Sequence, residues 1–329
     1  MSKKSKKRRR RPPPASPSGN GASAPAEKEP KPERGEAPPA PARRRFGERL
    51  FRPREAAVSP YPSLSVSLGR GMLPVGSSPA ILTIAFLTVL AIWGASVGVA
   101  RPLDPRGLVV TMGLPPIHVF LDLGIASVAA RDTITLTGYV FGGIILRAFV
   151  LGLLSLLIVT AVRDGRPDLR GSLRRLPKTA GRLFLLLSVE VAMLVSVLPL
   201  LQGFLGPGFG FTVMMALGIY FLVFVPVILA AEDTTLADAL RRSIKAARLP
   251  GPRHLLLALA YTLAINWILL ITPSSVVSPA TPSALTWVFA LLATFAHLAI
   301  LAALSFRWLA VRELVPHSPP PVRRPRTRP

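Results

Sequence analysis

Four polar side chains fall within stretches of the chain that are otherwise long enough and apolar enough to cross a membrane. They are Arg147, Glu190, Asn266 and His297. Placing an ionisable group in hydrocarbon is costly, so such groups usually face the interior of a helical bundle and serve a function there. At a rise of 1.5 Å per residue, Arg147 lies about 12 Å and Glu190 about 17 Å from the same end of neighbouring antiparallel stretches. The long arginine side chain can therefore reach the carboxylate.

This intramembrane polar cluster has two interpretations. In the first, the four side chains relay a proton or a substrate through the bundle. In the second, Arg147 and Glu190 form one neutralised ion pair that fixes helix packing. We favour the second interpretation, because an ion pair accounts for these residue types without a reaction.

A second group of candidate residues lies in the polar stretch AEDTTLADALRRSIKAARLP, residues 231–250. Thr235 and Asp238 have the spacing of a helix cap, and bases follow acids in the order that the helix dipole favours. The sequence therefore predicts an amphipathic helix over 235–247 that lies along the lipid headgroups or packs under the bundle. Its apolar stripe consists of Leu236, Leu240 and Ile244.

A weaker copy of this helix is predicted over residues 168–176, where SLRR at 172–175 matches ALRR at 239–242. Each copy is expected to connect a span that enters the cytoplasmic side with one that leaves it, which is typical of a parallel duplication. We expect the basic residues of the two copies to contact anionic lipid headgroups or a cytoplasmic protein partner. These residues are Arg174, Arg175, Arg241, Arg242, Lys245 and Arg248.

Little in the sequence points to a metal, a cofactor or a reaction. The absence of cysteine excludes disulfides, thiolate metal sites and cysteine nucleophiles. His118 and Asp122 share a helical face, but zinc usually needs at least three protein ligands. The motifs of nucleotide-binding loops, zinc proteases and serine hydrolases are missing. We therefore expect no cofactor, no metal and no catalytic residues, and a protein that is not an enzyme.

The hydrophobic residues, half of the 329, are concentrated in runs that match the thickness of a bilayer. A span needs about 20 mostly apolar residues. The predicted fold is all-α, a polytopic transmembrane helical bundle. Its six predicted spans lie near 79–100, 139–162, 183–201, 211–231, 254–271 and 284–307.

The net charge of +24 gives these spans an orientation. With the N-terminus inside, the loops and tails on the cytoplasmic side carry an excess of Lys and Arg, and the other side carries no net charge. Both termini are therefore predicted to be cytoplasmic. The apolar segment 114–130 is only 17 residues long, and we interpret it as an interfacial or re-entrant segment on the outer side.

The two ends of the chain are basic and rich in proline. Residues 1–61 contain 17 Lys and Arg against six Asp and Glu, and are predicted to be a disordered cytoplasmic tail. Residues 62–78 are interpreted as a pre-membrane linker, and 311–329 as a second disordered basic tail. No aromatic residues alternate with the basic cluster at 3–11, so sequence-specific nucleic-acid binding is not expected.

The stretch PVILAAEDTTLADALRRSIKAAR, residues 226–248, resembles a sequence found in a loose group of uncharacterised bacterial multi-pass membrane proteins. The group includes the membrane domain found fused to glycerophosphodiester phosphodiesterases. The resemblance extends over about residues 79–310. It implies an α-helical domain in the bacterial cytoplasmic membrane and transfers no catalytic residue.

Together these patterns favour a non-catalytic scaffold or accessory factor whose cytoplasmic face docks anionic lipid or a protein. The alternative is a permease-like membrane subunit of a transporter, because a cytoplasmic helix between spans resembles the coupling helix of ATP-binding-cassette permeases. That motif has glycine where Ser243 stands here. A third interpretation, a lipid-modifying enzyme that uses Glu190 or His297, has the least support.

Overall fold

The computed structural model describes residues 59–99, 117, 140–271 and 283–317. The chain divides into two units, 1–53 and 54–329, and all the described residues belong to the second. Regular structure in these ranges is entirely helical, as predicted. The predicted tail before residue 59, nearly all of the segment 114–130, and the second tail beyond 317 lie outside the described residues.

Among the described residues, four helical stretches are long and apolar enough to cross a membrane: Gly142–Asp164, Leu169–Leu205, Thr212–Ala231 and Ala284–Leu314. Two helices joined by an 89° bend, α2 (Leu64–Gly76) and α3 (Pro79–Val99), give a fifth if the pair is one span. The remaining predicted span, near 254–271, corresponds to α12 (Arg253–Ile271); within it, Arg253–Ala264 counts as a shorter apolar helix. This is the architecture of a multi-pass membrane protein.

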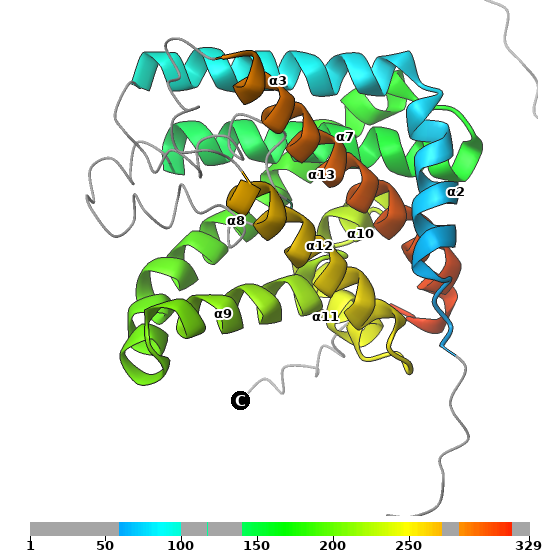
Figure 1. The fold of residues 1–329 in the computed structure, drawn as a ribbon. Helices are drawn as coiled ribbons and strands as arrows, with labels where there is room; N and C mark the ends of the chain where they lie inside the picture. Colours follow the sequence, from blue (N-terminus) through cyan, green and yellow to red (C-terminus); the bar gives the residue numbers. More distant parts are fainter. Residues whose placement is uncertain (1–58, 100–116, 118–139, 272–282, 318–329) are drawn as a thin grey trace, which may run out of the picture. The chain divides into compact units, whose positions relative to one another are not determined.

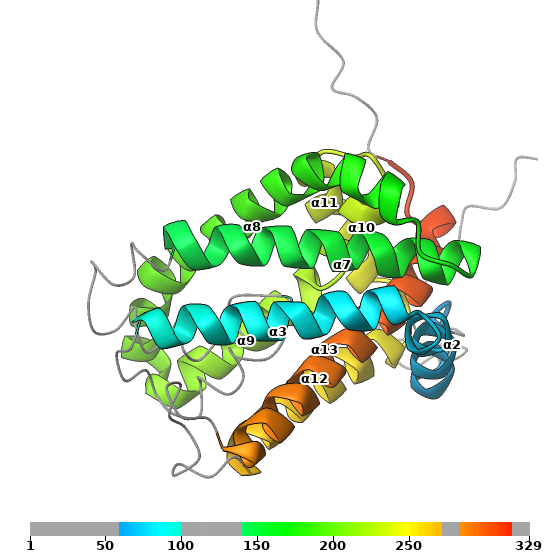
Figure 2. The same cartoon turned by 90° about the horizontal axis from the view of Figure 1, so that it is seen from above.

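Helix α7 (Ile145–Asp164) contributes most to the core. It begins after a short π-helical turn, Val140–Ile144, and packs against α2, α3, α8, α10 and α13. Its residues 154–161 are all buried, and the helix runs beside α3 in both views of the ribbon (Figures 1 and 2). A helix that is apolar on all sides has no face suited to water, so it is expected to be buried on all sides.

Helix α8 (Leu169–Leu205) combines two elements that were predicted to be separate. Its 37 residues include both the predicted cytoplasmic helix near 168–176 and the predicted span near 183–201, with Pro177 inside. Asp168 caps the helix by accepting a hydrogen bond of 2.9 Å from the amide of Gly171. At the other end one residue, Gly206, turns the chain with φ 84° into α9 (Pro207–Leu222).

Most of the predicted pre-membrane linker, 62–78, forms helix α2. Ser63 caps α2, which runs nearly at right angles to α3 (Figure 1). The helix packs closely on α13 (Ala284–Val311) at Gly71, where a Cβ atom would lie 2.6 Å from the carbonyl oxygen of Ala302. The absence of a side chain at Gly71 therefore allows the two backbones to touch.

Candidate functional site

The charged ends of the helices meet around one buried arginine, Arg307 near the end of α13. Its guanidinium donates hydrogen bonds to the hydroxyl of Ser67 at 2.8 Å, the carbonyl of Arg253 at 2.8 Å and the carbonyl of Pro62 at 3.1 Å. It also lies over the ring of Tyr61, 5.7 Å from the centroid. Arg307 thus ties α2, the start of α12 and the end of α13 together.

The predicted amphipathic helix exists as α11 (Leu236–Ala247) and is tied to the same region. Thr235 caps it by accepting from the amide of Asp238 at 3.2 Å, as the sequence predicts. At its other end, Tyr61 and Tyr220 donate to the carbonyls of Ala246 at 2.6 Å and Ala247 at 2.8 Å. Burial raises the pKa of the Tyr61 phenol, so this donor stays protonated well above neutral pH.

Small residues, not the leucines, form the buried face of α11. Ala239, Ser243 and Ala246 are fully buried, whereas the predicted apolar stripe is only partly covered. Ser243 donates at 2.6 Å to the carbonyl of Phe221, next to the break between α9 and α10 (Val225–Ala231). Small side chains therefore let α11 approach the bundle closely.

Arg242 was predicted to contact lipid or a partner at the surface, but its side chain is buried, only 2% exposed. It forms a two-pronged ion pair with Glu232, donates to the carbonyl of Val315 at 3.0 Å and lies 4.8 Å from the ring centroid of Trp308. His317 closes the cluster, 3.2 Å from a Glu232 oxygen and 2.9 Å from one of Asp238, with donor and acceptor roles set by its tautomer. Arg242 therefore holds the chain after α13 against α11.

The other predicted basic residues remain at the surface. Arg174, Arg241, Lys245 and Arg248 are exposed and Arg175 is partly exposed, and none of the five forms an ion pair with another described residue. We call these five residues the basic surface.

Two salt bridges link α8 to the turn before α11. Asp233, in the turn before α11, accepts hydrogen bonds from Lys178 at 2.5 Å and from Arg182 at 3.1 Å, both on α8. The Lys178 bond and then the Arg182 bond hold the pKa of the Asp233 carboxyl below its usual range. The contact joins the N-terminal part of α8 to the turn that precedes α11.

Three residues of the intramembrane polar cluster are buried: Arg147, Glu190 and His297. His297 lies 2.8 Å from the hydroxyl of Tyr261, which the sequence analysis did not identify, and within electrostatic range of Arg147. The His297 Nε2 atom is buried without a hydrogen-bond partner among the described residues. The side chain of Asn266 is outside the description, and the pairing of Arg147 with Glu190 stays a prediction.

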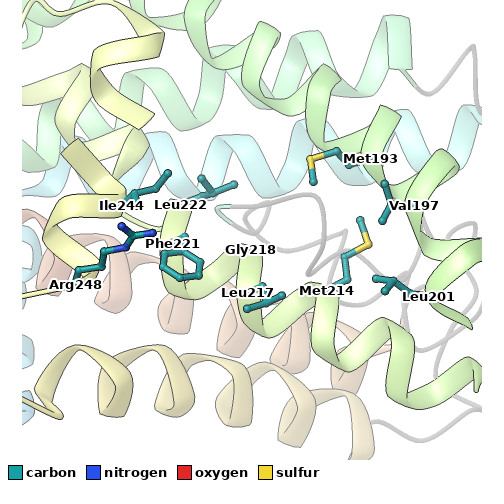
Figure 3. A pocket seen from close by; sticks show the side chains of 10 residues that line it. All are labelled: Met193, Val197, Leu201, Met214, Leu217, Gly218, Phe221, Leu222, Ile244 and Arg248. Carbon is teal, nitrogen blue, oxygen red and sulfur yellow. The ribbon is translucent and has the colours of Figure 1, made fainter. Parts of the chain in front are cut away.

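An apolar groove of about 340 Å³ lies between α8, α9 and α11 (Figure 3). Each helix contributes residues at helical spacing, and Arg248 is the single charged residue among them. The residues that line the groove are Met193, Val197, Leu201, Met214, Leu217, Gly218, Phe221, Leu222, Ile244 and Arg248.

Comparison with known proteins adds no assignment. The chain matches no protein-family model, no curated protein and no solved structure. Its resemblance to the bacterial multi-pass membrane proteins described above therefore stays a prediction. Five residues of these contacts were not predicted from the sequence: Tyr61, Glu232, Tyr261, Arg307 and His317. Each lies within or near a helix, and residues of these types are equally typical of solvent-exposed positions.

Proposed function

We propose that this protein is a non-catalytic membrane scaffold that docks anionic lipid headgroups through its basic surface. The observation that carries the proposal is the contrast between two sets of cations. Arg242 and Arg307 are buried and fully used in structural contacts, whereas the cations of the basic surface have no ion pair among the described residues. Cations near an anionic membrane surface contribute about 1 kcal/mol each.

The proposal includes an orientation. We place the charged ends of the helices in the cytoplasm, because cytoplasmic loops of membrane proteins carry an excess of Lys and Arg. The basic surface then faces the leaflet of a bacterial cytoplasmic membrane that contains anionic lipid.

A permease-like transporter subunit remains the alternative. It would need a polar cavity that opens onto the buried residues of the intramembrane cluster. In this structure Arg147 is 6% exposed, and Glu190 and His297 are each 1% exposed. The described groove has an apolar lining instead. These observations favour the scaffold.

The test measures the anionic lipid that co-purifies with the full chain in a mild detergent. The variant R241Q/K245Q removes two cations of the basic surface. Its matched control is R163Q/R166Q, which also removes two positive charges but from the end of α7 and the turn after it, where Arg163 is already paired with Asp164 at 2.8 Å. We expect R241Q/K245Q to retain several-fold less phosphatidylglycerol than wild type or control, with phosphatidylethanolamine unchanged.

Two results would overturn the proposal. Equal loss of anionic lipid in both variants would mean that total charge, not the basic surface, controls binding. Unchanged lipid combined with release of a co-purifying protein by R241Q/K245Q would mean that the surface docks a protein.

A further inference from the structure

The apolar groove is built from three stripes of side chains. Helix α8 contributes Met193, Val197 and Leu201 at intervals of four residues, and α11 with its C-cap residue contributes Ile244 and Arg248 at the same interval. The stripe on α9 runs from residue 214 to residue 222, about 12 Å at 1.5 Å per residue. The groove is therefore an elongated slot along α9.

The slot has an apolar end and a charged end. Figure 3 shows Leu201 and Met214 at one end and Ile244 and Arg248 at the other. It opens toward the outside of the bundle, since Leu217 is 54% exposed and Met193 42% exposed, whereas Met214 is buried. A molecule that fills this slot must be long, apolar along most of its length, and negatively charged at one end.

The surroundings determine what can fill it. Apart from Glu190, which is buried, residues 183–223 contain no Asp, Glu, Lys or Arg, so the slot opens beside a surface suited to hydrocarbon. An empty slot would lose dispersion contacts on both walls, so an apolar occupant is favoured. The volume of about 340 Å³ falls within the roughly 300–1,000 Å³ that is typical of small-molecule sites.

Arg248 sets the polarity of the occupant. Its side chain is exposed and forms no ion pair with another described residue. A guanidinium binds phosphate with charge-assisted, often bidentate hydrogen bonds. Arg248 directly follows Ala247, the last residue of α11, and the carbonyl of Ala247 accepts a hydrogen bond from the Tyr220 phenol. An aromatic side chain with a polar tip is typical of the boundary between hydrocarbon and headgroups.

We propose that this groove is a binding site for one anionic phospholipid, with an acyl chain between α8 and α9 and the phosphate on Arg248. The proposal rests on the proposed function, in that both involve anionic lipid, but it assigns one lipid to one defined site. The other four residues of the basic surface, by contrast, attract the leaflet as a whole.

The experiment uses the full chain in vesicles with a trace of phospholipid that carries a photoactivatable diazirine in one acyl chain. Two probes are compared, phosphatidylglycerol and phosphatidylcholine, and the labelled residues are mapped by mass spectrometry. We expect labelling at Met193, Val197 and Met214 that is about fivefold stronger with phosphatidylglycerol, which corresponds to about 1 kcal/mol for one cation near the surface.

Two variants test the two ends of the site. R248Q should abolish the preference for phosphatidylglycerol, and R248K should restore much of it. V197W places an indole in the slot and should remove groove labelling by both probes. Its matched control is V189W, the same change at a position on α8 that is 56% exposed and does not line the groove.

The possible outcomes separate this inference from the proposed function. Equal labelling by both probes, unchanged by R248Q, would overturn the anionic site and leave only general contact with bilayer lipid. Absence of groove labelling, with crosslinks to a second polypeptide instead, would assign the groove to a partner helix. In both cases the lipid loss measured with R241Q/K245Q still decides the proposed function, because neither of those residues lines the groove.

Discussion

At the scale of single residues, the charged end of the bundle depends on two arginines with different partners. Arg307 is satisfied mainly by backbone carbonyls, whereas Arg242 depends on one carboxylate, Glu232, whose side chain is 17% exposed. Removing one partner of a buried ion pair leaves an uncompensated charge, which costs more than the pair contributes as a whole. With Glu232 left in place, a neutral substitution of Arg242 should therefore reduce stability more than a neutral substitution of Arg307.

The substitution R242M should lower the free energy of unfolding by about 3 kcal/mol or more, because it leaves the Glu232 carboxylate without its arginine partner. Thermal unfolding in detergent, followed by size-exclusion chromatography, measures the change. R241M, on the exposed side of the same helix, is the matched control and should stay close to wild type. The double variant R242M/E232Q should recover part of the loss, and equal stability of R242M and R241M would contradict the assignment.

The link between α8 and the turn before α11 depends on the ionised form of Asp233. Since its pKa is lowered by the bonds from Lys178 and Arg182, this contribution to stability is fully present above about pH 4, the ordinary carboxyl range, and is lost as the pH falls through the lower folded value. An NMR titration of the Asp233 carboxyl should give a midpoint below that range. In K178Q/R182Q the midpoint should move upward; an identical midpoint would show that these bonds do not form.

At the scale of elements, close contact between helices depends on small residues as much as on large apolar ones. The buried face of α11 consists of alanine and serine beside Arg242, and α2 meets α13 at Gly71. Small residues at helix interfaces let backbones approach and gain dispersion contacts over many atoms. In this protein such contacts secure the two helices that lie outside the predicted spans, α2 and α11.

The change G71A should destabilise the protein by about 1–3 kcal/mol, because the new methyl group would overlap the backbone at Ala302. G69A on the same helix has nothing within 4 Å of the added atom, so it should leave stability unchanged or raise it by up to about 1 kcal/mol. Thermal unfolding of both variants in the same detergent measures the difference. The opposite order of stability would mean that α2 does not pack on α13 in this register.

At the scale of the whole molecule, charge and hydrophobicity are separated along the helices. The chain has no cysteine, so single cysteines can report which side of the membrane each end occupies. Arg170 lies near the N-terminus of α8, and Phe204, 87% exposed, lies at its other end. With 37 residues, α8 is about 55 Å long, which exceeds the hydrocarbon thickness of about 30 Å.

In spheroplasts, a charged and impermeant maleimide should label F204C from outside and should label R170C only after lysis. S155C, at a position that is 0% exposed, is the control and should stay unlabelled in both conditions. The reverse pattern would invert the proposed orientation. Labelling of both F204C and R170C in intact spheroplasts would show that α8 does not cross the membrane.

By itself, the sequence determined the all-helical class, the approximate position of the membrane-capable stretches and the cap of α11. These features depend on local patterns, namely runs of apolar residues near bilayer length and a threonine three residues before an aspartate. Segment boundaries were less well predicted. The cytoplasmic helix near 168–176 and the span near 183–201 were predicted as separate elements, yet α8 runs continuously through both.

Only the tertiary structure decided which charges are free. Arg241 and Arg242 are adjacent in sequence and chemically identical, yet one is exposed and the other pairs with Glu232 and holds the carbonyl of Val315, 73 residues away. The same holds for α2, whose role depends on a glycine facing Ala302. The physical reason is that burial is set by contacts between segments distant in the chain, and no local pattern contains that information.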